Sequence, residues 1–306
     1  VYEAGLNTEA AVGTHAGEAA YPTVANGTMN ITALDGVSTI KIGDVTVYEN
    51  NALTGNTVST DEGTLQVTGF DASTGKLTFM YTLTDNTTEH AQDTYNTSFS
   101  HDFTVTVTDT DGSADSSTIR INIIDDEPIA NADTLTIEAR SMVSVSGNVV
   151  TGTEHGDVAD TYGADGPATA GAFAWGETVT IKVNDESAAT GTLETDGTVK
   201  TADGDVLGTL ALGASGAYTF TASEAGYIYL RTTVDDNETA NAQISIGYTI
   251  TDADGDAKPS TLTINMSDKD NGVIVIPSDP EATSEQVTVY EAGLNTEAAV
   301  GTHAGE

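Results

Sequence analysis

The sequence predicts an all-β protein built from tandem β-sandwich domains that acidic linkers join end to end. In residues 103–108 apolar side chains alternate with threonines, and in residues 119–123 isoleucines alternate with polar residues. Each run therefore places its apolar set on one face of a strand. Between them, residues 109–112 read Asp-Thr-Asp-Gly, which is turn chemistry. Residues 125–128 read Asp-Asp-Glu-Pro, and the proline ends the strand ladder, so we expect a last hairpin followed by an acidic linker.

An internal repeat predicts the domain organisation. Residues 244–270 repeat the hairpin and its linker at an offset of 143 without a gap. Residues 1–18 recur identically at 289–306, an offset of 288. Such periods are typical of tandem arrays, and the chain is expected to be an excised piece of one. We assign two diverged domains, at 1–126 and 127–283, and the opening strand of a third at 284–306.

The first domain is expected to consist of short strands separated by Gly, Asn and Asp turns. Residues 1–6 begin as a strand, whereas 7–26 and 86–100 are polar loops. Residues 29–34 and 38–42 are predicted to form a hairpin about an Asp-Gly turn. The other predicted strands are 45–48, 64–70, 76–83, 103–108 and 119–123.

The second domain is expected to follow the same pattern after Pro128. Residues 147–171 form a long insertion that carries Asp157, Asp160 and Asp165. Trp175 is expected to be a core anchor rather than a ligand platform. No segment shows helical periodicity. The predicted strands are 134–137, 143–145, 178–183, 191–193, 206–212, 217–221 and 227–233, and residues 271–285 form a second linker.

The balance of charge favours a bound cation. Lys and Arg number 9 and Asp and Glu 47, which gives a formal net charge of −38. This argues against nucleic acid and against anionic membrane surfaces, because both are bound through Lys and Arg. The carboxylates repel one another in a compact chain, and Ca²⁺, which prefers oxygen ligands, would neutralise them. The alternative is a solvated acidic surface that serves solubility or a salty habitat.

The chain has no cysteine, so bound metal ions would stabilise its domains where extracellular domains often use disulfides. No run approaches the roughly 18 apolar residues of a membrane-spanning helix. No signal peptide is visible, which says little about secretion if the chain starts within an array.

The candidate metal ligands are carboxylates at the two ends of each final hairpin. Asp at alternating positions around a Gly turn lets several oxygens converge, and Ca²⁺ takes roughly six to eight oxygen ligands. The alternative for the turns is plain turn chemistry, since Asp and Gly favour hairpins anyway. The first set is Asp109, Asp111, Asp115, Asp125, Asp126, Glu127 and Asp133; the second is Asp252, Asp254, Asp256, Asp268, Asp270 and Glu281.

The turn and the linker of one domain are not expected to share an ion. The strand between them places them roughly 20–30 Å apart. The linker would instead draw ligands from loops of the next domain and tie the two domains together.

The sequence gives little support for an enzyme. No histidine lies in HExxH spacing, and no GxSxG elbow, P-loop or dinucleotide fingerprint is present. A carboxylate pair with glycosidase spacing is expected by chance among 47 acids. His90 and His101 fall in a polar loop and are expected to be solvated. We predict a protein that is not an enzyme.

Several stretches carry a resemblance to a known family. The first domain contains VYEAGL, GTLQVTGFDASTGKLTFMYTLTDN and DFTVTVTDTDGSADSSTIRINIIDDEP. It resembles the extender repeat, with a period of about 143 residues, of giant, type I secreted bacterial adhesins of the RTX class. The second domain, with GNVVTG, GTLALGASGAYTF and YTITDADGDAKPSTLTINMSD, resembles the same family and its cadherin-like, VCBS-type relatives.

The resemblance implies extracellular Ig-like or cadherin-like β-sandwich extenders, strung end to end on a bacterial surface. They would project a distal binding region for attachment and biofilm formation, with neighbouring repeats of the same chain as partners. The open alternatives are a module that binds carbohydrate or protein through residues 147–171 and 86–100, and a hydrolase.

The resemblance also implies that Ca²⁺ in the linkers stiffens the rod and promotes folding. Carried over by position, the ligands would be Asp125, Asp126 and Glu127 in the first linker. In the second linker they would be Asp268 and Asp270. Lys269 replaces an acid there, which weakens the second site.

Overall fold

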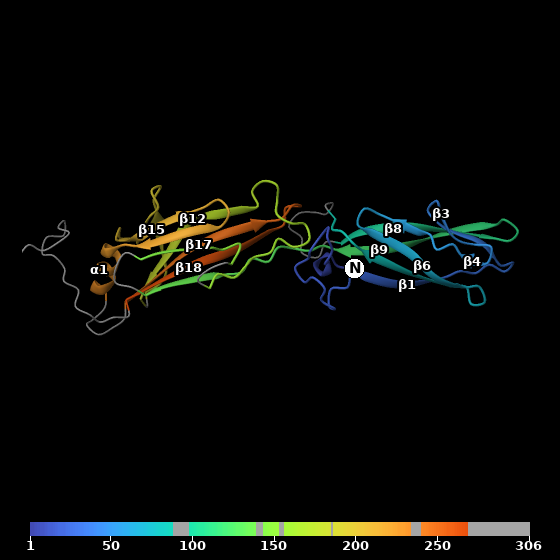
Figure 1. Ribbon diagram of the computed structural model, residues 1–306, viewed down its shortest axis with the longest axis horizontal. Coiled ribbons are helices and arrows are strands. Elements are labelled where there is room, and N and C mark those ends of the chain that lie inside the picture. The colour runs from blue at the N-terminus through green and yellow to red at the C-terminus, as the bar shows by residue number, and fades with distance from the viewer. Residues whose placement is uncertain (88–97, 139–142, 153–155, 185, 234–239, 269–306) are drawn as a thin grey trace, which may run out of the picture.

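The computed structural model describes residues 1–87, 98–138, 143–152, 156–184, 186–233 and 240–268. Within these ranges the chain folds into two β-sandwich domains that lie end to end along one long axis (Figure 1). The predicted all-β class is confirmed. The acidic linker that begins at Asp125 directly follows the last strand of the first domain.

The first domain is a sandwich of two antiparallel sheets. One sheet has the strand order β1-β7-β6-β5 and the other the order β4-β3-β2-β8-β9. Ile119, Ile121 and Ile123 are buried between the sheets, whereas the residues that separate them are exposed, as the alternation predicts. The strands are β1 (Val24–Asn30), β2 (Val37–Ile42), β3 (Val45–Glu49), β4 (Ala52–Leu53), β5 (Thr57–Ser59), β6 (Gly63–Asp71), β7 (Lys76–Leu83), β8 (Ser98–Asp109) and β9 (Ala114–Ile124).

Two local predictions for the first domain are wrong. The segments 29–34 and 38–42 do not form a hairpin, because β1 pairs with β7 and β2 pairs with β3 and β8. Alternation alone does not say which sheet a strand joins, and here the chain crosses from one sheet to the other. Residues 1–6 are not a strand either: η1 (Glu3–Gly5) is a 3₁₀ turn, and Tyr2 forms an isolated bridge with Ile124.

The second domain is a sandwich formed by one long sheet that passes from layer to layer. Its order is β10-β18-β17-β12-β13-β14-β15-β16-β11. The first residues of β13 pair with β12 and its last residues pair with β14, so β13 carries the sheet across. The strands are β10 (Asp133–Glu138), β11 (Ser144–Asn148), β12 (Phe173–Val183), β13 (Ala189–Leu193), β14 (Thr198–Lys200), β15 (Val206–Leu212), β16 (Ala217–Ala222), β17 (Ala240–Thr251) and β18 (Ala257–Asp268).

The single tryptophan packs against the core of the second domain. Trp175 packs against the buried cluster, contacts the Phe173 ring edge-on, and donates from Nε1 to the Gly213 carbonyl at 2.9 Å. The prediction that Trp175 anchors the core is confirmed.

One predicted strand is a helix. Residues 227–233 are rich in Tyr and Ile, which favours a strand, but α1 (Glu224–Thr232) covers most of them. Ser223 caps the helix, and its side chain accepts a hydrogen bond from the Gly226 amide at 2.9 Å. Tyr227 and Leu230, three residues apart, are buried on one face. Ser223 is a residue type that favours helix starts, whereas the alternation of Tyr227 and Tyr229 is typical of a strand.

Candidate metal centre

Carboxylates from both domains converge where the domains meet. Ligand atoms of Glu3, Asp125 and Asp165 all lie within 4.8 Å of one another, and so do those of Asp165, Asp252 and Asp254. Asp165 belongs to both groups. We call these five residues the junction cluster.

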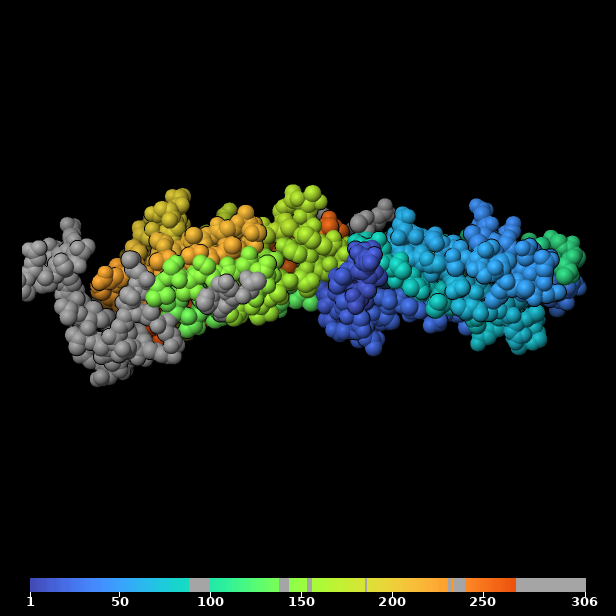
Figure 2. Space-filling view, in the orientation of Figure 1, coloured from blue at the N-terminus to red at the C-terminus, as the bar shows by residue number. Residues whose placement is uncertain are grey.

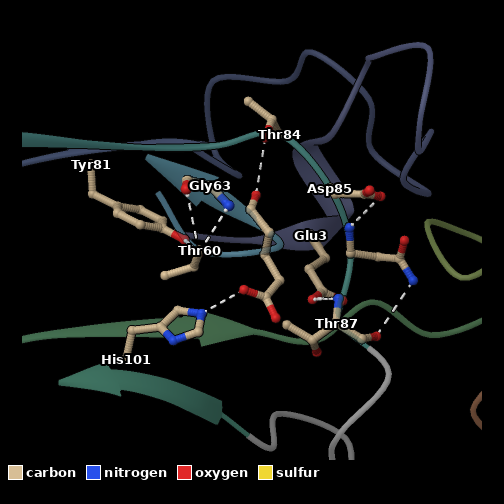
Figure 3. A network of polar contacts seen from close by, with 10 residues as sticks. Glu3, Thr60, Gly63, Tyr81, Thr84, Asp85, Thr87 and His101 are labelled. Atoms are coloured by element: carbon tan, nitrogen blue, oxygen red, sulfur yellow. Dashed lines mark hydrogen bonds and ion pairs between the residues drawn. The ribbon is translucent and has the colours of Figure 1, made fainter. Parts of the chain in front are cut away.

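The first domain contributes Glu3 and the linker contributes Asp125. Glu3 lies in the turn η1, and the backbone amide of Thr87 donates to its Oε1 at 2.7 Å (Figure 3). Asp125 directly follows β9, so the end of the last strand fixes its place. Both residues therefore lie at the end of the first sandwich that faces the second.

The second domain contributes Asp165 from its insertion and Asp252 and Asp254 from the β17–β18 turn. Oδ1 of Asp252 accepts hydrogen bonds from the amides of Gly255 and Asp256 at 3.1 and 2.6 Å. One oxygen of Asp252 therefore holds the turn. Across the junction, Nδ2 of Asn86 donates to Oδ1 of Asp165 at 2.7 Å.

Two carboxylates of the junction cluster are fully buried with an unsatisfied oxygen. Glu3 and Asp252 are each 0% exposed. Among the described residues, Oε2 of Glu3 and Oδ2 of Asp252 have no hydrogen-bond partner. A buried polar atom without a partner is costly, and it is rare in native proteins. A proton shared with a neighbouring carboxylate or a bound cation would satisfy these atoms.

The pKa values of three carboxyl groups in the junction cluster are raised. Burial, together with the neighbouring Asp165 charge, raises the pKa of Glu3 to about 8. Burial, together with the charge of Glu3, raises the pKa of Asp125 to about 9. Burial and a contact with Asp254 raise the pKa of Asp252 to about 9. Without a cation, the cluster therefore holds protons at neutral pH, and a divalent ion would displace them.

The donor set fits Ca²⁺. All five side chains offer carboxylate oxygens, and the described cluster contains no nitrogen or sulfur ligand. Hard cations prefer such oxygens, and Ca²⁺ accepts irregular geometry and high coordination numbers. Zn²⁺ would prefer imidazole or thiolate ligands. Because Asp165 belongs to both groups, it connects the carboxylates of the two domains at one place.

The other linker acids join the domains by direct contacts. Oδ2 of Asp126 accepts hydrogen bonds from the amides of Thr14 and Ala164 at 2.8 and 2.9 Å, and its Oδ1 accepts one from the Thr14 hydroxyl. Nζ of Lys258 lies 2.6 Å from Oε2 of Glu127. Asp126 thus links a loop of the first domain to the insertion of the second.

The insertion also reaches into the first domain. Ala164 is 7% exposed and packs in the hydrophobic core of the first sandwich. In the space-filling view the surface of the insertion lies next to that of the amino-terminal loop (Figure 2). Of the predicted insertion 147–171, Gly147 and Asn148 belong to β11, and the rest lies between β11 and β12, where it contributes to the junction.

A substitution at Gly163 tests the contact between the insertion and Asp126. Its φ is +75°, and an added Cβ would lie 2.5 Å from Oδ2 of Asp126. We expect Gly163→Ala to lower stability by about 2–3 kcal/mol, from the left-handed backbone and the clash together. Gly166→Ala is the matched control: its φ is +68° and nothing lies within 4 Å of the added Cβ. Chemical denaturation of both variants checks this, and equal losses would contradict a special role for the Asp126 contact.

The far end of the first domain repeats half of the junction cluster. Asp35, Asp109 and Asp111 lie together there, largely exposed. Oδ1 of Asp109 accepts hydrogen bonds from the amides of Gly112 and Ser113, as Asp252 does with Gly255 and Asp256. The Thr110 amide donates to Gly36, as the Ala253 amide does to Gly166. Asp35, Asp109 and Asp111 therefore correspond to Asp165, Asp252 and Asp254.

The remaining predicted ligands lie elsewhere. Asp115 is exposed on β9 and accepts from the Ser116 amide at 2.8 Å. Asp133 is buried in the second domain, where it accepts from the Val158 amide and the Tyr248 hydroxyl at 2.8 and 3.0 Å. Asp256 is buried in the β17–β18 turn, outside the two carboxylate groups. The Asp268 side chain, Asp270 and Glu281 lie outside the described residues.

Sequence reasoning missed Glu3, Asp35 and Asp165 as candidate ligands. Asp35 and Asp165 both precede a glycine shortly before a strand of their domain, and this shared Asp-Gly signal could have identified them. Glu3 carries no local signal, because only the fold brings it to the linker.

The solvated state predicted for His101 is wrong. Its Nε2 lies 2.6 Å from Oε2 of Glu62, and both side chains are mostly buried. The residue lies in β8, which extends further towards the junction than the polar composition suggested. His90 lies outside the described residues.

Within the described part of the chain, no helix is long and apolar enough to cross a membrane. No family model and no curated protein matches the sequence. Among solved structures, protocadherin gamma C5 EC1-3 is 13% identical, with 86% of this chain and 63% of that chain covered and a TM-score of 0.23. SporoSAG from Toxoplasma gondii is 13% identical, with 78% and 91% covered and a TM-score of 0.19.

Zebrafish RET cadherin-like domains 1 to 4 are 7% identical, with 81% of this chain and 43% of that chain covered and a TM-score of 0.21. The chain thus spans less than two thirds of the protocadherin and RET structures. Cadherin-like domains are among its weak structural neighbours. With scores this low, the fold assignment rests on the strands described above.

Proposed function

We propose that the chain is a Ca²⁺-stabilised structural extender of a large bacterial surface adhesin, and that it is not an enzyme. The observation that carries this is the junction cluster, in which an acidic linker and loops of both domains supply carboxylates to one place. A site of this composition would hold two domains in a defined orientation rather than bind and convert a substrate.

In this proposal Ca²⁺ restrains the angle between the sandwiches. Glu3 and Asp125 would hold the ion from the first domain and its linker. Asp165, Asp252 and Asp254 would hold it from the second. The contacts of Asp126 and the Lys258–Glu127 pair act beside it, and ion binding would remove the remaining freedom of bending.

The repeat extends the proposal to an array. Asp35, Asp109 and Asp111 reproduce the half of the junction cluster that the second domain supplies, at the outer end of the first domain. A preceding repeat that ends in an acidic linker would complete a second site there. Neighbouring repeats are therefore the proposed partners, and extracellular exposure after type I secretion, with a role in attachment and biofilm, is the proposed setting of this RTX-type module.

Small-angle X-ray scattering of the full chain tests the extender role. We expect a narrow distribution of maximum dimension in millimolar Ca²⁺ and a broader distribution in EDTA, because ion-free carboxylates repel across the junction. Mg²⁺ should have little effect, since it retains its waters.

Asp165→Asn is expected to leave a broad distribution even in Ca²⁺, whereas Asp35→Asn, at the corresponding outer position, should behave as the wild type. Identical scattering in Ca²⁺ and EDTA would overturn the stiffening role.

A further inference from the structure

One short segment, residues 84–87, holds a carboxylate of the junction cluster from each domain. The backbone amide of Thr87 donates to Oε1 of Glu3 at 2.7 Å, and Nδ2 of the preceding Asn86 donates to Oδ1 of Asp165 at 2.7 Å. Glu3 belongs to the first domain and Asp165 to the second, and ligand atoms of the two lie within 4.8 Å of one another. The position of residues 86 and 87 therefore determines how these two carboxylates meet.

The start of this segment is fixed by the backbone of Glu62. The Glu62 carbonyl accepts hydrogen bonds from the amides of Thr84 and Asp85 at 2.8 and 3.0 Å, and from the Thr84 hydroxyl at 3.2 Å. Glu62 lies in the turn between β5 and β6, and Thr84 directly follows β7. Figure 3 shows the segment from Thr84 to Thr87, with Glu3 beside Thr87. A displacement of Glu62 would therefore displace the groups that hold Glu3 and Asp165.

The side chain of Glu62 is held from the opposite sheet by His101. Nε2 of His101 lies 2.6 Å from Oε2 of Glu62, and the two side chains are 19% and 15% exposed. His101 lies in β8, whereas β6, which follows Glu62, belongs to the other sheet. Burial raises the pKa of Glu62, but hydrogen bonds from its own backbone amide and from His101 outweigh burial and hold the pKa below its usual value. The ionised carboxylate thus links the two sheets through His101.

The second domain shows that the fold does not require this pair. At the offset of 143 His101 corresponds to Ile244, and where β6 aligns with β15, at an offset of 145, Glu62 corresponds to Leu207. The Ser223 amide donates to the Leu207 carbonyl at 3.1 Å, which repeats the hydrogen bond at the Glu62 carbonyl. Leu207 and Ile244 are both 0% exposed in the core of the second domain. Apolar residues are therefore accommodated at both positions.

The surroundings of the pair in the first domain are apolar as well. Phe99, His101 and Phe103 share one face of β8, opposite isoleucines of β9. The ring centroids of Phe99 and Phe103 lie 4.8 and 6.0 Å from that of His101. Replacing both members of a buried hydrogen-bonded pair with apolar residues is often neutral or stabilising. We therefore expect the pair to contribute little to stability and to serve the placement of Glu62 instead.

We propose that Glu62 and His101 are positioning residues of the junction cluster, which act through residues 84–87. His101 fixes the side chain of Glu62, and the Glu62 carbonyl fixes the start of the segment. The end of the segment then places one carboxylate of each domain. This role rests on the proposed binding of Ca²⁺ to the junction cluster. Groups that orient metal ligands typically contribute about 10–100-fold to affinity.

Calorimetric titration of the full chain with Ca²⁺ tests this role. The double variant, Glu62→Leu with His101→Ile, introduces the residues that the second domain has at these positions. We expect it to bind Ca²⁺ about tenfold more weakly or worse, because residue 62 then has no directional contact with β8. Its melting temperature in EDTA should be unchanged or higher, because apolar contacts replace the pair. A lower melting temperature in EDTA with unchanged affinity would show a merely structural pair and overturn the proposal.

Two further variants separate positioning from a general effect of the substitutions. Glu62→Gln retains a side chain that can hydrogen bond to His101, and it should bind Ca²⁺ as tightly as the wild type. Asp102→Asn removes an exposed ion pair with Arg120 from the same strand, and it should also bind as the wild type does. A loss of affinity in Asp102→Asn equal to that of the double variant would overturn the specific role of Glu62 and His101.

Amide hydrogen exchange in EDTA measures the positioning without the ion. The amides of Thr84, Asp85 and Thr87 should exchange faster in the double variant than in the wild type, and at the wild-type rate in Glu62→Gln. Unchanged exchange of Thr84 and Asp85 in the double variant would overturn the role of Glu62. A wild type that does not bind Ca²⁺ would overturn the proposed function itself, whereas a double variant that binds as tightly as the wild type would overturn only the positioning role.

Discussion

In EDTA at about pH 8, Asp252→Asn is expected to raise the stability of the chain, and in millimolar Ca²⁺ the same substitution is expected to lower it relative to the wild type. The Asp252 carboxylate is fully buried, and its pKa is raised by burial and by its neighbour Asp254. Asn retains the oxygen that accepts from Gly255 and Asp256 but removes the ionisable group. Without an ion, the folded state no longer has to take up a proton on a buried carboxyl group at this pH, a gain of at least about 1–3 kcal/mol.

With Ca²⁺ present the balance reverses. A ligand at about 100 times its Kd contributes about 2.7 kcal/mol to the folded state, and the loss of one carboxylate removes much of that. For a domain of this size, about 1 kcal/mol corresponds to roughly 2–4 °C in melting temperature. Thermal melts in EDTA and in Ca²⁺ would measure both signs.

Asp109→Asn is the matched control for this experiment. Asp109 holds the corresponding turn in the first domain through the same hydrogen bonds, but it lies in the largely exposed cluster at the outer end. Its substitution should leave the response to Ca²⁺ unchanged. A Ca²⁺ response that Asp252→Asn leaves intact would show that the ion binds elsewhere or not at all.

The second large effect is the dependence of stability on pH in the absence of Ca²⁺. Burial, followed by the charge of neighbouring carboxylates, raises the pKa of Glu3 to about 8 and of Asp125 to about 9. In the unfolded chain these groups titrate near pH 4. Between these values the folded state binds more protons than the unfolded state, so stability is highest at low pH and falls as the pH rises.

We therefore expect the free energy of unfolding in EDTA to fall by at least about 2 kcal/mol between about pH 5 and pH 9. Exposed acids with lowered pKa, such as Asp71 and Asp102, act at lower pH and do not affect this window. Ca²⁺ should remove the decline, because it replaces the protons. Denaturant titrations at several pH values measure the slope, and a rise in stability over this range in EDTA would contradict the assignment.

The sequence was sufficient to identify the all-β class, because apolar alternation and Asp-Gly turns are local signals. Alternation in 103–108 and 119–123 identifies strands whose apolar faces are buried in the structure. The sequence also gave a reason for linker and turn to belong to different sites, since one strand separates them. The structure places Asp125 beside Asp165, which in turn lies beside Asp252 and Asp254 in the turn of the following domain.

What could not be predicted depends on long-range placement. Glu3 is 122 positions from Asp125 in sequence, and only the docking of η1 beside the end of β9 brings them together. The strand expected at 227–233 is a helix, because a capping serine outweighed the β-favouring tyrosines. Alternation could not decide that β1 and β2 belong to opposite sheets. In each case tertiary contacts decided between conformations that the local sequence permits.

The insertion of Ala164 into the neighbouring sandwich bears on the order of folding. A residue beyond the end of the first domain fills part of that domain's core, and Asp126 accepts a hydrogen bond from its amide. The first sandwich cannot complete its interior until the loop of its successor is in place. Folding of such a chain is then sequential, because each domain completes its core only when the following domain has folded. A domain that fails to fold would therefore leave the core of the preceding domain incomplete.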